Sequence, residues 1–125
     1  MSRYVCLWEF RVKPESVGDF ERTYGPDGDW ARLFRRGAGY VRTELLRELG
    51  APDENPLPAL PLGRGGASTA APRDPGRFVT IDHWRSRADF ERFQADFAAE
   101  YAALDAACAA YTLDERLIGH FVAAP

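Results

Sequence analysis

The sequence is poor in cysteine, histidine and lysine. Of its 125 residues, two are cysteines, two are histidines and only Lys13 is a lysine. Cys6 and Cys108 make no disulfide framework, and with the two histidines they show no metal-ligand spacing, so no metal site is expected. The net charge of −3 argues against nucleic-acid binding, which needs clustered positive charge.

Long apolar runs are also absent. No uncharged stretch approaches the roughly 18–20 residues of a membrane span. Residues 1–3 lead into a strand-like segment instead of the apolar core of a signal peptide. We therefore expect no membrane partner and a cytoplasmic location, which the low cysteine content also favours.

The composition that remains is that of a soluble globular protein, with 46% hydrophobic and 28% charged residues. The length predicts a single domain spanning residues 1–125. Residues 50–76 differ from the rest, with six of the nine prolines, five of the eleven glycines and no aromatic residue. Structureless loops longer than about 12–15 residues are functional or mobile. We favour a mobile excursion between two strands over an ordered lid.

Alternating apolar and polar residues predict four strands, and apolar residues at helical spacing predict the helices between them. Asp29 is a candidate cap for the short helix, Ser86 and Asp89 form a capping-box pattern, and Thr112 with Glu115 repeats that spacing on a short turn. The predicted strands cover residues 4–12, 40–49, 77–84 and 116–123, and the predicted helices cover 14–24, about 30–34 and a continuous 86–108.

This order predicts an α+β, ferredoxin-like fold, a four-stranded antiparallel sheet with helices on one face. The other face would carry large apolar side chains, including Trp8 or Trp84, and an exposed patch of that size is unusual in a monomer. Burial against the same face of a second copy predicts a homodimer, a dimeric α+β barrel with pockets between sheet and helices.

The chain resembles the antibiotic biosynthesis monooxygenases, a family of dimeric α+β barrel proteins. The similarity lies in an aromatic-rich first strand, a glycine turn before the second strand, and a third strand that ends in Trp followed by Ser and a helix. The matching segments are YVCLWEFRV, GAGYVRTELL, FVTIDHWRSRADFERF and FERTYGPDGDWARLF. The resemblance implies a cofactor-free oxygenase of aromatic polyketides, a heme-degrading enzyme, a quinol-related enzyme or a protein without activity.

The heme-degrading members have an Asn on the first strand and an axial His on the following helix. Here the single asparagine is Asn55, in the 50–76 segment, and Phe93-Gln94 occupies the axial region. Neither residue ligates iron as histidine does, so heme degradation is disfavoured and no cofactor is expected. Of the Asn–Trp–Tyr-like set of the cofactor-free members, the tryptophan carries over as Trp84.

Proton transfer has three candidates. Asp82 is a carboxylate inside an apolar strand, and His83 and His120 are the natural acid–base groups near neutral pH. If Asp82 and Trp84 face the pocket, His83 is expected to face the helices and to be a packed or edge residue. For His120 the alternative is a surface histidine bonded to backbone, with Leu117, Gly119 and Phe121 on the other face.

Substrate contacts have four candidates. Trp8 and Trp30 offer flat walls for an aromatic ligand, or else pack in the core or the dimer. Arg42 and Glu44 share a strand face and either contact the substrate or form a cross-strand ion pair.

Two functions remain open. The first is a cofactor-independent monooxygenase-like enzyme acting on a small aromatic or polyketide-type molecule, with Asp82, His83, His120 and Trp84 as its catalytic residues. A carboxylate would deprotonate a phenol or anthrone, and the resulting carbanion would react with oxygen. The second is a non-catalytic dimeric binding or accessory protein with a hydrophobic pocket. A cavity with a carboxylate or imidazole directed into it favours the enzyme, and a pocket filled by Trp and Phe favours the binding protein.

Overall fold

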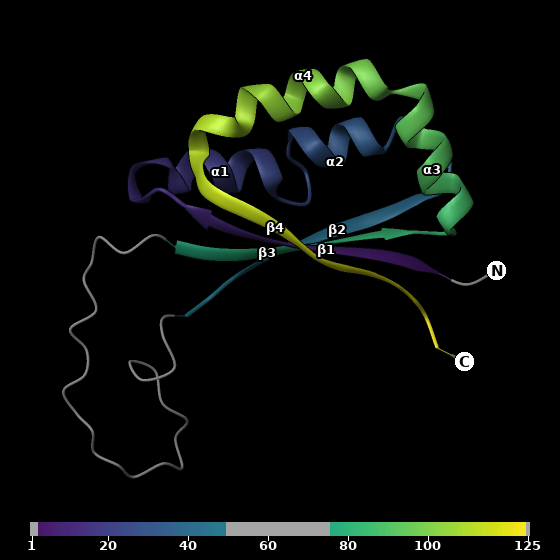
Figure 1. Cartoon of the computed structure of the whole chain (residues 1–125), viewed down its shortest axis with the longest axis horizontal. Coiled ribbons are helices and arrows are strands. Elements are labelled where there is room, and N and C mark those ends of the chain that lie inside the picture. Colours follow the sequence, from purple (N-terminus) through teal and green to yellow (C-terminus); the bar gives the residue numbers. More distant parts are fainter. Residues whose placement is uncertain (1–2, 50–75, 125) are drawn as a thin grey trace, which may run out of the picture.

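The computed structural model describes residues 3–49 and 76–124 (Figure 1). The predicted 50–76 loop therefore lies outside the described residues, apart from Gly76, which begins a strand. In chain order the elements are β1 (Tyr4–Val12), η1 (Pro14–Ser16), α1 (Val17–Tyr24), α2 (Asp29–Phe34), β2 (Tyr40–Arg47), β3 (Gly76–Trp84), α3 (Arg87–Asp96), α4 (Ala98–Cys108), η3 (Ala109–Tyr111) and β4 (Thr112–Val122).

The four strands form one antiparallel sheet in the order β2-β3-β1-β4. All helices lie on the same side of this sheet, with α4 crossing above α1 and α2 and with α3 at one end (Figure 1). The predicted ferredoxin-like α+β fold is confirmed. The described helices include no candidate for a membrane span.

The core lies between the sheet and the helices because side chains that face the helices alternate along β1 and β3 with side chains that face away from them. In β1, Tyr4, Cys6, Phe10 and Val12 are buried on the helix side. The largest fully buried side chains are Trp84, Phe20, Phe78 and Phe93, drawn from β3, α1 and α3. Burial of each such side chain contributes about 1.5–3 kcal/mol.

The predicted continuous helix over 86–108 is two helices. Phe97 leaves the helical conformation, with φ −119° and ψ 28°, and separates α3 from α4. The apolar residues keep helical spacing on both sides of Phe97. Because the break involves a single residue, the spacing does not reveal it. The bend lets α4 pack on α2, where the rings of Tyr101 and Trp30 lie 4.9 Å apart. The Ser86 cap is confirmed, since its hydroxyl accepts a hydrogen bond from the Asp89 amide at 3.2 Å.

Two predicted caps are wrong. Thr112 begins β4 because it pairs with Val12, so strand pairing overrides the local capping pattern and lengthens the strand predicted over 116–123. Asp29 is the first helical residue and Gly28 is the cap. A Cβ at Gly28 would lie 2.4 Å from the Arg22 carbonyl oxygen, so the close approach of the chain requires glycine there.

The helix-free face of the sheet is aliphatic at its centre and charged at its margin. Val5, Leu7, Val79 and Ile81 are half-buried there, beside an exposed Phe121. The expectation that Trp8 or Trp84 lies on this face is wrong. In both strands the bulky aromatic residues take the alternate positions, which face the helices.

Candidate functional site

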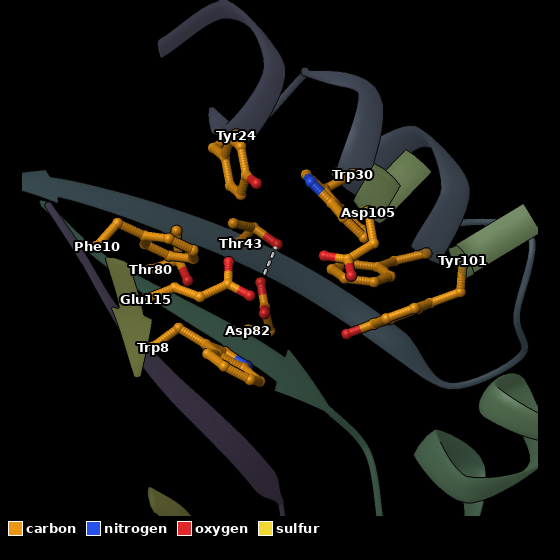
Figure 2. A pocket seen from close by; sticks show the side chains of 11 residues that line it. Trp8, Phe10, Tyr24, Trp30, Thr43, Thr80, Asp82, Tyr101, Asp105 and Glu115 are labelled. Atoms are coloured by element: carbon orange, nitrogen blue, oxygen red, sulfur yellow. Dashed lines mark hydrogen bonds between the residues drawn. The ribbon is translucent and has the colours of Figure 1, made fainter. Parts of the chain in front are cut away.

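Two cavities lie between the sheet and the helices. The first, of about 50 Å³, has three carboxylates among its lining residues, and we name it the acidic chamber. The second, of about 200 Å³, includes His120, and we name it the histidine chamber. The two chambers share the lining residues Trp8, Phe34, Asp82 and Tyr101. Figure 2 shows the side chains of the acidic chamber, most of which are aromatic.

Asp82 lies on β3 and points from the sheet toward the helices (Figure 2). Its side chain is 8% exposed. The Thr43 hydroxyl donates a hydrogen bond of 2.7 Å to Oδ1 of Asp82. Burial raises the pKa of Asp82 to about 6, and this hydrogen bond opposes the rise. A carboxylate with that pKa is ionised at neutral pH and is a stronger base than an ordinary aspartate.

A β-bulge in β2 aligns the groups behind Asp82. Thr43 pairs with Asp82 and Tyr40 pairs with Trp84, with a register shift between Tyr40 and Arg42. In a regular strand, residues three apart point to opposite faces, but the extra residue of the bulge returns Tyr40 to the face of Thr43. The two hydroxyl oxygens lie 2.7 Å apart. Because the Thr43 proton is directed to Asp82, Tyr40 donates to Thr43.

Two further carboxylates lie at the exposed side of the acidic chamber. Asp105 comes from α4 and Glu115 from β4, and both side chains are exposed (Figure 2). Partial burial of the carboxylate raises the pKa of Glu115, and the charge of Asp105 raises it further. Burial raises the pKa of Tyr101 to about 12, with added contributions from Asp105, Asp82 and Glu115. The three carboxylates therefore all contribute negative charge to the acidic chamber.

The histidine chamber contains a tyrosine–histidine pair. The Tyr4 hydroxyl lies 2.9 Å from Nδ1 of His120, across the sheet from β1 to β4. Burial raises the pKa of Tyr4 to about 12, so its hydroxyl stays protonated at neutral pH. Cys6, which is buried, and Gln94 line the same chamber.

The structure brings together some of the residues predicted from the sequence. Trp8, Trp30 and Asp82 line the acidic chamber, and His120 lines the histidine chamber. Trp84 lines neither: it is fully buried behind the site, against Phe34 and Tyr40.

Three predicted residues lie on the helix-free face. His83 alternates with Asp82 and Trp84, so the expectation that it faces the helices is wrong. Its Nε2 lies 2.7 Å from a carboxylate oxygen of Glu44, which also contacts Arg42 at 3.4 Å. Arg42 and Glu44 therefore pair with each other along β2 and not across strands, as the alternative had it, and the cross-strand partner of Glu44 is His83. None of the three residues lines either chamber.

The expected surroundings of His120 need a correction as well. Leu117 lies with His120 in the histidine chamber, instead of on the opposite face. A register shift in the pairing of β1 with β4, between Leu7 and Trp8, moves Leu117 to the helix side.

The residues of the site that sequence reasoning missed include Thr43, Tyr101, Asp105 and Glu115. Asp105 could have been found, because it follows Tyr101 by four residues on the face of the apolar stripe. Glu115 was assigned to a turn and not to β4. The sequence around Thr43 does not indicate its role, because that role depends on its pairing with Asp82 on β3.

Comparison with known proteins gives structural matches only. No protein-family model matches the sequence, and a search of curated proteins finds no match. Solved structures do match. A variant of SnoaB, a cofactor-independent oxygenase from Streptomyces nogalater, is 23% identical with a TM-score of 0.56, covering 100% of this chain and 96% of that one.

Two more solved structures match over the whole chain. A proposed antibiotic biosynthesis monooxygenase from Bordetella bronchiseptica is 13% identical, with a TM-score of 0.61 and 100% of both chains covered. A dimeric ferredoxin-like protein from an uncultured marine organism is 9% identical, with a TM-score of 0.61, covering 100% of this chain and 90% of that one. The fold is that of the antibiotic biosynthesis monooxygenase-like proteins. At these low sequence identities, the matches show that the chain and these proteins share a fold.

The two chambers are lined by several ionisable side chains. Among residues 3–49 and 76–124, no group of three His, Cys, Asp or Glu side chains is arranged to hold a metal ion. The groups available for proton transfer inside the cavities are Asp82, Glu115 and Asp105, with His120 at the far side.

Proposed function

We propose that this protein is a cofactor-independent oxygenase that acts on a small aromatic molecule of the phenol or anthrone type. The observation that supports it best is the position of Asp82, a buried carboxylate shared by two cavities and aimed into them. The likeness to SnoaB adds support at the level of the fold.

In the proposed reaction, Asp82 removes a proton from an activated ring carbon. The electron pair of the broken C–H bond stays on carbon as a carbanion, which the ring delocalises. Dioxygen then takes electrons from this carbanion, a C–O bond forms, and the peroxide anion recovers a proton from Asp82. Loss of water from the hydroperoxide gives a ketone. One oxygen atom ends in the product and one in water, so the four electrons lost by carbon reduce one dioxygen molecule.

In this proposal, the other residues of the two chambers orient Asp82 and hold the substrate. Thr43 and Tyr40 orient the Asp82 carboxylate through their hydrogen bonds. Trp8 and Trp30 provide the flat walls against which an aromatic ring packs. His120, whose Nδ1 lies 2.9 Å from the Tyr4 hydroxyl in the neighbouring chamber, is a second candidate for proton transfer.

The helix-free face supports a homodimer as part of this proposal. Leu46 and Phe121 are 49% and 50% exposed beside the aliphatic centre of that face, and contiguous apolar patches of this kind are unusual in monomers. The likeness to a structure described as dimeric is consistent with this arrangement. Two copies would meet sheet to sheet and leave the chambers on the helix sides. The free, buried Cys6 and Cys108 are consistent with the proposed cytoplasmic location.

The rival proposal is a non-catalytic dimeric binding or accessory protein. Oxygen consumption with a panel of hydroxyanthrones and quinols decides between the two. We expect consumption that Asp82→Asn reduces about a hundredfold or more, while Asp96→Asn, which removes an exposed carboxylate on α3, leaves the rate unchanged. Saturable binding of the same compounds without oxygen consumption would favour the binding protein.

A further inference from the structure

The two chambers meet at four residues that come from four different elements. Trp8 lies on β1, Phe34 on α2, Asp82 on β3 and Tyr101 on α4, and these four line both chambers. We name this place the junction. It brings the proposed base, Asp82, together with two aromatic side chains that carry a polar hydrogen and with one apolar ring. A ligand that extends through both chambers therefore contacts the junction.

Tyr101 reaches the junction from the helix layer, opposite the sheet that supplies Asp82 and Trp8. Figure 2 shows its ring extending from α4, with the hydroxyl end turned toward those two residues. The ring packs against Trp30, with 4.9 Å between the ring centroids and 66° between the ring planes, and against Phe93, with 6.5 Å between the centroids. These contacts hold the ring in place without using its hydroxyl.

The Tyr101 hydroxyl is available to a ligand. It forms no hydrogen bond within the part of the chain that the structure describes, whereas the Tyr4 hydroxyl lies 2.9 Å from Nδ1 of His120. Burial, and to a smaller extent the charge of the neighbouring carboxylates, raises the pKa of Tyr101 to about 12, so the hydroxyl stays protonated at neutral pH. Tyr101 is therefore a hydrogen-bond donor that faces the proposed base across the cavity.

The proposed reaction needs a donor for the substrate itself. When Asp82 removes the ring proton, its negative charge passes to the substrate, which delocalises this charge onto a conjugated oxygen. The hydrogen bond from Thr43 stays on Asp82. Neither chamber has an arginine or lysine among its described lining residues, so the developing charge on the oxygen depends on neutral donors for its stabilisation.

We infer that Tyr101 donates a hydrogen bond to a ring carbonyl oxygen of the substrate while Asp82 removes a proton from the conjugated ring carbon. The C–H electron pair moves into the ring, the carbonyl becomes an enolate oxygen, and the proton goes to Asp82. An aromatic ring ketone is thus favoured over a simple phenol, whose acidic hydrogen is on oxygen. This inference rests on the proposed function and narrows its substrate class.

Tyr101 can act as a donor without losing its proton. The enolate oxygen of an aromatic ring ketone is a phenolate oxygen, and phenols ordinarily have a pKa of about 10. Because the pKa of Tyr101 is raised to about 12, the proton stays on Tyr101. The hydrogen bond strengthens as charge develops on the substrate oxygen, so it stabilises the transition state more than the bound ketone.

The kinetic test is Tyr101→Phe, which removes the hydroxyl and keeps the ring against Trp30. With a hydroxyanthrone, we expect kcat for oxygen consumption to fall about a hundredfold while KM changes little. The rise of kcat/KM through pH of about 6 should remain, since Asp82 is still the base. The matched control is Tyr111→Phe, at a half-buried tyrosine of η3 that lines neither chamber, and it should keep the wild-type rate. An unchanged kcat in Tyr101→Phe, or an equal loss in both variants, overturns the inference.

A second test does not depend on turnover. The probes are 1-tetralone and tetralin, which have the same ring system with and without a carbonyl group, and their affinities for the full chain are measured by titration calorimetry. We expect the wild type to bind the ketone at least about threefold more tightly, and Tyr101→Phe to lose this preference.

Infrared difference spectroscopy reports on the hydrogen bond directly. The C=O stretch of bound 1-tetralone should lie at a lower frequency than in hexane, and Tyr101→Phe should move it back toward the hexane value, whereas Tyr111→Phe should not. The same carbonyl frequency in the wild type and in Tyr101→Phe, or no binding of 1-tetralone to the wild type, overturns the inference.

Failure of this inference and failure of the proposed function are distinguishable. If a hydroxyanthrone is oxidised in an Asp82-dependent manner but Tyr101→Phe changes neither kcat nor the carbonyl frequency, the donor is wrongly assigned and the oxygenase remains. If Tyr101 lowers the carbonyl frequency of 1-tetralone and no oxygen is consumed with the panel of hydroxyanthrones and quinols, the ketone site stands and the oxygenase does not.

Discussion

Asp82 and His83 are neighbours in the sequence and lie on opposite faces of the sheet. Asp82 points into the cavities under the helices, where Thr43 binds it at 2.7 Å, and His83 contacts Glu44 at 2.7 Å on the helix-free face. One strand thus supplies a residue to the candidate site and a residue to the surface at which we propose that two copies meet. The two faces can be tested separately.

The pH dependence of activity follows from the raised pKa of Asp82. The base acts when ionised, so kcat/KM for a neutral substrate should rise with pH through about 6 and level off above it. Stopped-flow or electrode measurements of oxygen consumption between pH 5 and 8 check this profile. A rate that is flat across this range in the wild type would show that Asp82 is not the base.

Thr43 should set the position of that inflection. Its hydrogen bond lowers the pKa of Asp82, so Thr43→Val, which removes the donor at nearly constant shape, should move the inflection of kcat/KM to higher pH. Thr43→Ser keeps the hydroxyl and is the matched control, and its inflection should stay near that of the wild type. If the Thr43→Val and Thr43→Ser variants have the same pH dependence of kcat/KM, the hydrogen bond does not position the carboxylate.

Stability should depend on pH through the same residue, with a definite sign. The pKa of Asp82 is about 6 in the folded protein and 3.8 without perturbation, so between these values the folded state binds more protons. The free energy of unfolding therefore falls as pH rises from 4 to 6, by up to about 3 kcal/mol from this group. In urea unfolding, Asp82→Asn should lose this part of the slope and exceed the wild type in stability at pH 8. An unchanged slope would indicate that the carboxyl is not buried.

Much of this fold could be predicted from residue patterns. The alternation in 4–12 and 77–84 sorts the side chains between two faces, because every aromatic residue of these segments stands on the same set of alternate positions. The features that escaped prediction depend on single backbone positions. The bend at Phe97 and the register shifts in the pairing of β1 with β4 and of β2 with β3 leave the apolar spacing intact. The bulge in β2 is the one that shapes the candidate site, since it places Tyr40 behind Thr43 and Asp82.

Trp84 and Trp8 should respond differently to the same substitution. Trp84 is fully buried against Phe34 and Tyr40 and lines neither chamber, so Trp84→Phe should lower the free energy of unfolding by about 1–3 kcal/mol and affect ligand affinity little. Trp8 is half-buried and lines both chambers, so Trp8→Phe should weaken binding of the ring with a smaller loss of stability. Urea unfolding and titration calorimetry on both variants separate the two roles, and a reversed pattern would place Trp84 in the ligand site.

The proposed dimer is tested most directly at the centre of the helix-free face. Leu7 is half-buried there, between Ile81 of β3 and Gly119 of β4, and a second copy would bury it completely. Leu7→Glu places a charge in that interface without touching the chambers, and an unpaired buried charge costs several kcal/mol. We therefore expect a monomer in sedimentation velocity at micromolar concentration, while the wild type sediments as a dimer. Leu49→Glu introduces the same charge at a residue that is already 79% exposed, and this control should remain dimeric. A monomeric wild type would remove the sheet-to-sheet interface, whereas a dimeric Leu7→Glu variant would move the interface to another surface.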